Sequence, residues 1–391
     1  MKIYHTNLVG IMKQKIIYLD NAATTPVLKS VQKEMAKVQK TFFGNSESSH
    51  KLGAQANALV LEVKDVLAKQ INAEREEIYF TSSGSEANTW AIIGLALANK
   101  NKGNHLIVSA IEHESVLSAC KFLEKQGFEI TYVKPNKNGE ISPKDIEEAI
   151  TPKTILISVM MANNEIGAIQ NTSEIAKIAK AKNVMFHSDC VQSFGHLNID
   201  VKQLGLTAIS VSAHKIGGPK GIGMLYLKNG TNIENLIFGG AQEFGKRGGT
   251  SATPLICGFK IAVQETYKNF AKNNEKFLET RNFFKQELKA NFSNYEINES
   301  KNNLPNILSV TFKGFDANLL ISKLDMENVC VSRGSACTAG DPLPSHVLLA
   351  MGKTEDANST VRFSFSAKTA KNDIKRVITA LKNALGEKYG K

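Results

Sequence analysis

Short apolar runs rich in β-branched residues alternate with longer stretches of helical spacing between about Val31 and Leu227. Strands that are buried on both faces have such continuous apolar runs, and their alternation with helices is typical of a mostly parallel sheet covered by helices. The pattern therefore predicts an α/β domain in this part of the chain. The runs that we expect to form strands are residues 78–81, 106–109, 154–161, 184–187, 208–211 and 223–227.

The pattern changes after Gly258, where helical spacing and isolated strands replace the regular alternation. The expected elements are a lysine-rich helix to about residue 290, strands at 308–312 and 361–365, a loop rich in Gly and Pro at 332–344, and a closing helix from about residue 372. This mixture predicts a second, smaller α+β domain. We expect an N-terminal extension with a small-domain segment at residues 1–30, a large domain at 31–259 and a small domain at 260–391.

The composition excludes two classes of protein. Of the 391 residues, 42% are hydrophobic and 22% are charged, which is an ordinary globular mixture and argues against disorder. The longest apolar runs, 91–98 and 154–162, are far shorter than the roughly 18 to 20 residues of a membrane helix. We therefore expect no membrane association and, because no secretory signal is recognisable, a cytoplasmic protein.

Charge and cysteine content leave the choice of partner open. The net charge of +11 is compatible with nucleic acid, with acidic protein partners or with a merely lysine-rich composition. The last is favoured, because no compact basic block with interleaved aromatic residues is present, and no direct nucleic-acid binding is expected. The five cysteines are scattered and form no Cys-x-x-Cys pair, so neither a disulfide framework nor a metal site is expected.

A lysine follows the expected strand at 208–211 in the sequence Ser-Ala-His-Lys, which ends at Lys215 and precedes a glycine-rich turn. Ligands of parallel sheets bind beyond the carboxyl ends of the strands, where a partly desolvated amine can form a Schiff base. Alone, a loop lysine is more often a surface residue. Asp189 favours the functional interpretation, because a carboxylate at the end of the neighbouring strand suits the protonated nitrogen of a pyridine ring.

Further polar residues follow other expected strands. The turn from Thr81 to Trp90 reads Thr-Ser-Ser-Gly-Ser-Glu-Ala-Asn-Thr-Trp, and amides and hydroxyls at the start of a helix bind phosphate well, although such residues are also ordinary caps. His113 and Asn164 each follow a strand. His113 would therefore share a sheet edge with Lys215, where an imidazole can stack on a ring and move protons.

The predicted small domain contributes a cysteine and an arginine. Cys337 lies in a loop of small residues, and a thiol in such a loop is either incidental or a nucleophile on a mobile arm. Arg362 lies inside an expected strand, where its guanidinium fork can hold a substrate carboxylate through two hydrogen bonds.

Together these residues resemble the cysteine desulfurases, which are pyridoxal-phosphate enzymes of the fold-type I aminotransferase architecture. The similarity runs in the family's order from residues 18–25 (Tyr-Leu-Asp-Asn-Ala-Ala-Thr-Thr) to Arg362, and Gly-Ser-Ala-Cys at 334–337 is among its most distinctive parts. The resemblance implies a large domain with a mostly parallel seven-stranded sheet flanked by helices, and a smaller α+β domain.

The resemblance also implies a role for each candidate residue. Lys215 would hold pyridoxal 5′-phosphate, Asp189 would face its ring nitrogen, and Cys337 would be the nucleophile. Arg362 and Asn164 would bind the substrate, L-cysteine. The remaining cofactor contacts would be Gln192 and Asn164 near the phenolic oxygen, His113 stacked on the ring, Gly84, Ser85, Ser212 and His214 around the phosphate, and Thr250 reaching that phosphate from the second subunit of a homodimer.

In this family, cysteine becomes alanine and its sulfur becomes a persulfide on the nucleophile. The run from Gly334 to Met351 resembles the long-loop branch, which implies sulfur acceptors such as an iron–sulfur scaffold or a tRNA-thiolation enzyme. Three features depart from the family: Phe244 stands in place of an arginine, Arg333 in place of a small residue, and the chain extends upstream of Lys15.

Two other functions stay open on the sequence alone. The chain could be another pyridoxal-phosphate enzyme of the same fold, such as an aminotransferase or a selenocysteine lyase, in which Cys337 is incidental. It could also be a basic protein that binds RNA or a scaffold without chemistry, although Lys215 and Asp189 argue against that. Cys190 is expected to be a packing residue, since a free cysteine is commonly a small buried hydrophobe.

Overall fold

The main sheet has seven strands in the computed structural model, which describes residues 15–334, 344–386 and 389–390. The strand order is β2-β8-β7-β6-β5-β3-β4, with β8 antiparallel to both neighbours and the pairs from β7 to β4 parallel. The predicted mostly parallel seven-stranded sheet is therefore confirmed. The strands are β2 (Ile78–Thr81), β3 (His105–Ser109), β4 (Glu129–Val133), β5 (Thr154–Ser158), β6 (Met185–Asp189), β7 (Ala208–Ser212) and β8 (Gly223–Leu227).

The apolar runs explain which strands the sequence reveals. Every residue of β3, β5, β7 and β8 is buried, as expected for strands covered on both faces. Strand β4 was missed by the sequence analysis. It lies at an edge of the sheet, and only Val133 of its five residues is buried, so it lacks a continuous apolar run.

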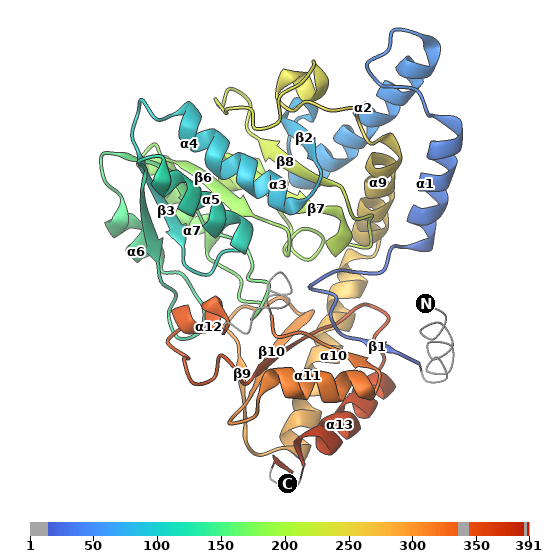
Figure 1. The fold of residues 1–391 in the computed structure, drawn as a ribbon, viewed down its shortest axis with the longest axis vertical. Coiled ribbons are helices and arrows are strands. Elements are labelled where there is room, and N and C mark those ends of the chain that lie inside the picture. Colours follow the sequence, from blue (N-terminus) through green and yellow to red (C-terminus); the bar gives the residue numbers. More distant parts are fainter. Residues whose placement is uncertain (1–14, 335–343, 387–388, 391) are drawn as a thin grey trace, which may run out of the picture.

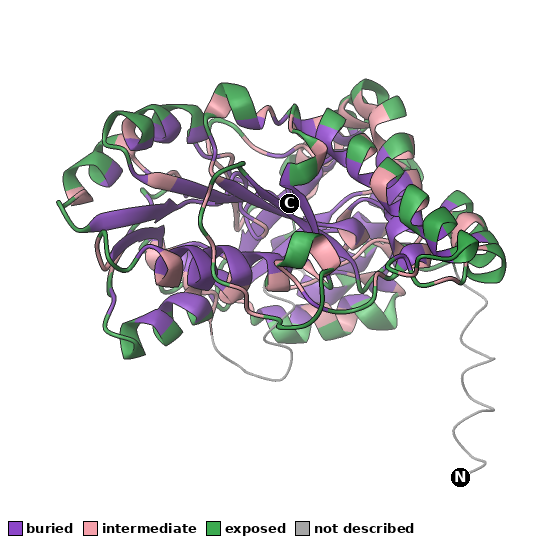
Figure 2. Ribbon diagram, turned by 90° about the horizontal axis from the view of Figure 1, so that it is seen from above, coloured by how far each residue is buried: buried purple, intermediate pink, exposed green. Residues whose placement is uncertain are grey.

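Helices cover both faces of the sheet, and Figure 2 shows the buried strands between two layers that are exposed on their outer sides. One apolar core includes residues of α1, α2, α7 and α9, and another lies beneath α3 and α5. The helices are α1 (Lys29–Thr41), α2 (Lys51–Ile71), η2 (Arg75–Glu77), α3 (Gly84–Thr89), η3 (Trp90–Gly94), α4 (Leu95–Ala98), α5 (Glu114–Lys125), α6 (Pro143–Ala149), α7 (Thr172–Ala181), α8 (Val201–Leu204), η4 (Ala213–Lys215), η5 (Gln242–Gly245) and α9 (Thr253–Lys268).

The lysine-rich helical region is two helices instead of one. Helix α9 ends at Lys268 and α10 (Phe270–Asn291) begins after Asn269, whose backbone leaves the helical conformation. Val263 of α9 packs in the core of the sheet, whereas Phe284 of α10 packs in a separate apolar core. The two helices thus connect two cores (Figure 1). The domain boundaries at 30/31 and 259/260 stay a proposal.

The second core lies around a small antiparallel sheet with the order β12-β10-β9. Residues near both ends of the described chain contribute to it, because β1 pairs with β11 in parallel and Asp20 bridges to Ser364. The sequence analysis missed β9, α11, β11 and α12. The elements are β1 (Ile17–Tyr18), β9 (Tyr295–Asn298), β10 (Ile307–Phe312), α11 (Ala317–Met326), β11 (Val329–Cys330), α12 (His346–Ala350), β12 (Thr360–Ser364) and α13 (Lys371–Leu385).

This arrangement places the carboxyl ends of β3, β5, β6 and β7 toward the second core, which lies below the sheet in Figure 1. Ligand sites of parallel sheets lie at these strand ends. Among the described residues, no helix combines the length and the apolar composition needed to cross a membrane.

Candidate active site

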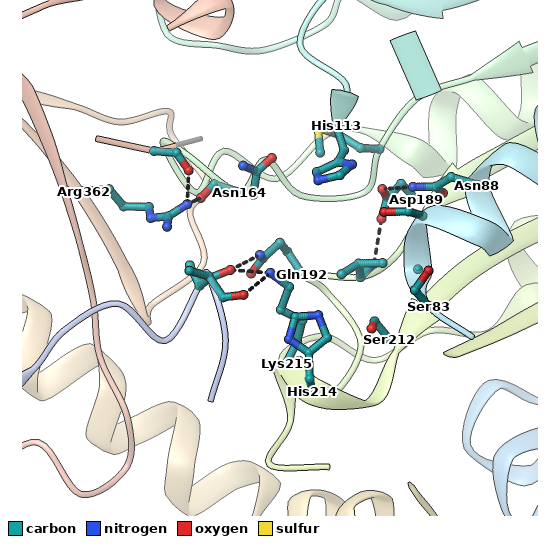
Figure 3. Close-up of a pocket in the computed structure, with 17 residues that line it drawn as sticks. Ser83, Asn88, His113, Asn164, Asp189, Gln192, Ser212, His214, Lys215 and Arg362 are labelled. Carbon is teal, nitrogen blue, oxygen red and sulfur yellow. Dashed lines mark hydrogen bonds between the residues drawn. The ribbon is translucent and has the colours of Figure 1, made fainter. Parts of the chain in front are cut away.

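One pocket lies where the strand ends of the main sheet meet β12, and Figure 3 shows side chains from both regions pointing into it. Most of the predicted site residues line this pocket, although they are widely separated in the sequence. Those that line it are Gly84, Ser85, His113, Asn164, Asp189, Gln192, Ser212, His214, Lys215 and Arg362.

Lys215 lies in η4, directly after β7. Its Nζ donates hydrogen bonds to the backbone carbonyls of Ala22 at 2.6 Å and Ala23 at 2.9 Å. These carbonyls belong to the segment between β1 and α1, which therefore forms one wall of the pocket. The sequence analysis did not predict them, because backbone acceptors leave no signature in side-chain identity.

Asp189 ends β6 and is buried, with 4% of its surface exposed. One carboxylate oxygen accepts from Asn88 Nδ2 at 2.6 Å, and the other accepts from the backbone N–H of Val191 at 2.8 Å. Asn88 also donates to Ser115 Oγ at 3.0 Å. The carboxylate is therefore fixed in orientation before any ligand binds. Asn88 was missed, although its place one helical turn after Gly84 on α3 was a usable signal.

The part of the pocket lined by Gly84 and Ser212 can hold an anion. A Cβ atom added at Gly84 would lie 2.7 Å from Val191 Cγ2 and 3.3 Å from Ser212 Cβ, so only glycine lets the backbone approach this closely. Ser212 Oγ is buried and has no hydrogen-bond partner among the described residues. A bare backbone beside an unused hydroxyl fits the phosphate group of a cofactor.

His214 adds a neutral imidazole to this side of the pocket. Burial, assisted by the charges of Lys215 and Lys220, lowers the pKa of His214 to about 4. Its Nδ1 lies 3.1 Å from Thr24 Oγ1. The ring is therefore uncharged at neutral pH and can offer phosphate a hydrogen bond without a full positive charge.

His113 is the N-cap of α5, and its Nδ1 accepts from the backbone N–H of Ser115 at 3.1 Å. The same nitrogen lies 2.8 Å from Ser115 Oγ. Because Nδ1 accepts a backbone hydrogen bond, the proton of the neutral ring resides on Nε2. Gln192, another residue in the pocket, donates to the carbonyl of Ala22 at 2.9 Å.

Arg362 enters the pocket from β12 and is almost completely buried. Its Nη1 donates to the backbone carbonyls of Asn164, at 2.8 Å, and Gly334. Its Nη2 forms an ion pair with Asp20 at 2.8 Å. A substrate carboxylate that approaches Nη1 must therefore replace one of the two carbonyls.

The other two predicted site residues are Thr250, which does not line the pocket, and Cys337. Thr250 is exposed, in the loop between η5 and α9. Cys337 lies outside the described residues.

Two of the three departures from the family, Phe244 and Arg333, lie in the described residues and have partners of their own. Phe244 lies in a left-handed turn with Glu243, and Lys64 Nζ lies 4.4 Å from the centre of the Phe244 ring while it pairs with Glu243. The guanidinium of Arg333 donates to the side-chain oxygens of Asn318 and Asn358.

The comparisons with known proteins cover almost the whole chain. The aminotransferase class-V family matches residues 17–377. A cysteine desulfurase named IscS from Clostridium botulinum (strain Hall) is 43% identical over 94% of this chain and 94% of its own length. The chain belongs to the cysteine desulfurase family. Cysteine desulfurases of the class-V aminotransferases are pyridoxal 5′-phosphate enzymes, so the predicted enzyme class and cofactor are confirmed.

More distant relatives and solved structures agree with this membership. The cysteine desulfurase IscS of Dictyoglomus turgidum is 41% identical over 96% of this chain and 95% of its own length. A structure described as a NifS-like protein superposes with a TM-score of 0.89, at 30% identity over 95% of this chain and 99% of that one. A structure described as SspA in complex with cysteine has a TM-score of 0.81, at 38% identity over 90% of this chain and all of that one.

Proposed function

We propose that this cysteine desulfurase converts L-cysteine to L-alanine and takes up the sulfur as a persulfide on Cys337. The observation that carries the proposal is the composition of one pocket, in which Lys215 and Asp189 of the main sheet face Arg362 of the small sheet. The name of a similar structure, SspA in complex with cysteine, supports cysteine as the substrate.

The pocket suits pyridoxal 5′-phosphate on each side. Lys215 would link to it covalently, Asp189 would face its ring nitrogen, and the phosphate would lie against Gly84, Ser212 and His214. When bound, this cofactor supplies an electron sink that lets the proton on the substrate Cα leave. The paired Asp189 carboxylate matches such a ring, because the hydrogen bond from Asn88 keeps an oxygen of Asp189 in place.

Arg362 is assigned to the substrate carboxylate. Its contacts with the Asn164 carbonyl and Asp20 hold the guanidinium at the boundary between the two sheets. A carboxylate forms stronger hydrogen bonds with a guanidinium than a backbone carbonyl does, so cysteine can replace a carbonyl at Nη1. This exchange orients the substrate with its thiol away from Arg362.

Two side chains are assigned to proton movements. The amine of Lys215 takes the proton from the substrate Cα, because a lysine in the pocket is the base nearest the covalent site. His113 is assigned to the proton of the substrate thiol; because Nε2 already carries the proton of the neutral ring, the accepting atom is Nδ1, which must first leave its contact with Ser115. Lys215 then returns its proton to Cα and His113 gives its proton to the methyl group of alanine, so both groups regain their starting state.

The sulfur-transfer step balances without an external oxidant. The thiolate of Cys337 forms a bond with the substrate sulfur, and the bond between that sulfur and the substrate Cβ breaks. The electron pair of the broken bond stays with carbon, which gains a proton and becomes the methyl group of alanine. One substrate thiol and one protein thiol therefore give alanine and one persulfide.

The proposal includes two kinds of protein partner: a second subunit that completes the cofactor site, and an acceptor that takes the persulfide sulfur. We include in the proposal a homodimer in which Thr250 of the second subunit reaches the phosphate, since Thr250 is exposed in a single chain. The relatives' names support sulfur delivery, and the acceptors proposed here are an iron–sulfur scaffold or a tRNA-thiolation enzyme. A cytoplasmic location also stays a prediction.

The proposal is tested by following alanine and protein-bound persulfide after L-cysteine is added with a reductant. We expect the wild-type protein to form both and Cys337→Ala to form neither above background. Cys330→Ala is the matched control, because Cys330 is a partly exposed free cysteine of the same region, and it should behave like the wild type. Equal turnover by the wild type and Cys337→Ala would contradict the proposal.

A further inference from the structure

Glu165 is a buried carboxylate that the proposed chemistry does not use. Only 3% of its surface is exposed, and it follows Asn164 in the turn after β5. This turn is held from within, because Asn163 Oδ1 accepts from the backbone N–H groups of Glu165 at 2.9 Å and Ile166 at 3.0 Å. The backbone that carries the Glu165 side chain is therefore held in place, next to Asn164, which lines the pocket.

The residues on both sides of segment 335–343 contact this one carboxylate. Ser345 Oγ donates to Glu165 Oε2 at 2.5 Å. Gly334 lies directly against it, since a Cβ added at Gly334 would be 2.7 Å from Glu165 Oε2, and the backbone there has a φ of +126°. Glu165 thus receives a hydrogen bond from one flank and requires glycine at the other.

Further contacts connect the same two flanks with the pocket. The carbonyl of Gly334 accepts from Arg362 Nη1. On the other flank, His346 Nε2 donates to the backbone carbonyl of Glu112 at 3.0 Å, and Glu112 directly precedes His113. The first turn of α12 is therefore attached to the loops that carry His113 and Asn164.

We infer that Glu165 is a positioning residue for the sulfur-transfer step, which sets the ends of the Cys337 segment relative to the substrate. The inference rests on the proposed function. Ser345 is suited to this contact because its hydroxyl also accepts from the N–H of Leu348 as the N-cap of α12, so its proton is directed at Glu165. Glu165 contacts no proposed reacting atom, so its effect is confined to geometry.

The test compares Glu165→Ala with the conservative variant Glu165→Gln, which keeps an acceptor oxygen for Ser345. Ser345→Ala removes the donor, and Ser345→Thr restores a hydroxyl. Two control variants remove the same kinds of group, a buried carboxylate and an N-cap hydroxyl, at positions that do not line the pocket. In Glu77→Ala the lost carboxylate is buried and accepts from the N–H groups of Glu74 and Asn229, and in Ser142→Ala the lost hydroxyl is the N-cap of α6.

Two signals are recorded in a single turnover of the cofactor-loaded protein with L-cysteine. The change in cofactor absorbance reports substrate binding, and persulfide on Cys337 reports sulfur transfer. Displacement of a reacting group by about 1 Å costs on the order of 100-fold in rate. We therefore expect Glu165→Ala and Ser345→Ala to slow persulfide formation by about 10- to 100-fold while the absorbance change persists.

The other variants decide whether the two residues act through each other. We expect Glu165→Gln and Ser345→Thr to recover most of the rate, both controls to match the wild type, and the double alanine variant to be no slower than Glu165→Ala. If Glu165→Ala and Ser345→Ala form persulfide within about twofold of the wild-type rate, the inference is overturned but the proposed function is not. The same holds if these variants lose the absorbance change in parallel with persulfide formation. A wild-type protein that forms no persulfide overturns the proposed function and this inference with it.

Discussion

The two sides of the pocket are built in different ways. On the sheet side, side chains at the ends of neighbouring strands are held by partners close to them in space, as Asp189 is held by Asn88 and Val191. On the β12 side, Arg362 and the flanks of segment 335–343 are held by contacts with loops of the main sheet, such as the bond from Ser345 to Glu165. We assign the first side to the cofactor and the second to substrate and sulfur.

This difference implies that substitutions on the two sides of the pocket should impair different steps of the reaction. Loss of a group on the sheet side should remove the cofactor chemistry and every later step. Loss of a group on the β12 side should leave the cofactor in place and affect substrate binding or sulfur transfer alone. The variants below test this separation, beginning with the largest expected effect.

Lys215→Ala should abolish the chemistry on both sides of the pocket. Without the amine there is no covalent link to the cofactor, and we expect alanine formation to fall by at least about three orders of magnitude. The absorbance of the linked cofactor near roughly 400 nm should also disappear. Lys220→Ala, in the exposed part of the same turn, should retain both signals. Equal activity of Lys215→Ala and Lys220→Ala would contradict the assignment of Lys215 to the cofactor.

Asp189→Asn should keep the cofactor in place but impair its use. The amide cannot hold the ring nitrogen in its protonated form, so we expect kcat to fall by about 100-fold. Asn88→Ala, which only frees one oxygen of Asp189, should lower kcat by about tenfold. Steady-state kinetics measure both effects. A larger loss in Asn88→Ala than in Asp189→Asn would contradict the assigned roles.

Arg362→Lys should affect substrate binding more than the later steps. Lysine keeps the charge but cannot form the paired hydrogen bonds of a guanidinium, so we expect the KM for cysteine to rise by about 10- to 100-fold with a smaller change in kcat. The cofactor absorbance should be unchanged. Arg333→Lys serves as the control, because Arg333 bonds Asn318 and Asn358 instead of the pocket. An unchanged KM in Arg362→Lys would remove Arg362 from the substrate site.

Glu112→Gln should change stability with little effect on activity. Burial raises the pKa of Glu112 from 4.5 to about 8. Between these values the folded protein keeps a proton that the unfolded chain releases, so this group's contribution to the free energy of unfolding falls as the pH rises. Glutamine has no such proton, and the variant should gain roughly a few kcal/mol relative to the wild type from about pH 4.5 to 8.

Denaturant unfolding at several pH values measures this difference, with Glu77→Gln as a second buried carboxylate for comparison. Stability curves of the wild type and Glu112→Gln that run parallel across the window would show that Glu112 is ionised in the folded protein.

The sheet side of the pocket was predictable from the sequence, and the β12 side only in part. Lys215, Asp189 and His113 each follow an expected strand, and parallel strands bring such residues to one edge. Glu165 also follows an expected strand, but this position does not reveal its role, because its partner Ser345 is 180 positions away and only the folded chain brings them together. Arg362 was found through its place inside an expected strand, whereas its contacts with Asn164 and Gly334 were not predicted.

The fold shows the same limit. Strands covered on both faces were predicted to within a few residues, whereas the edge strand β4 was missed because only one of its five residues is buried and it lacks a continuous apolar run. The break between α9 and α10 was also missed, because Asn269 interrupts a helical pattern that continues on both sides. Both features depend on which residues are buried by segments distant in the sequence, and the local sequence does not show that burial.

The central claim is that the sulfur of cysteine moves to Cys337. The most direct measurement adds cysteine with isotopically labelled sulfur to the cofactor-loaded protein for one turnover without reductant, and then locates the label by mass analysis of peptides. The account predicts one labelled sulfur atom on the peptide that contains Cys337 and an equal amount of alanine. Label on Cys330 or another cysteine, or alanine without protein-bound label, would contradict it.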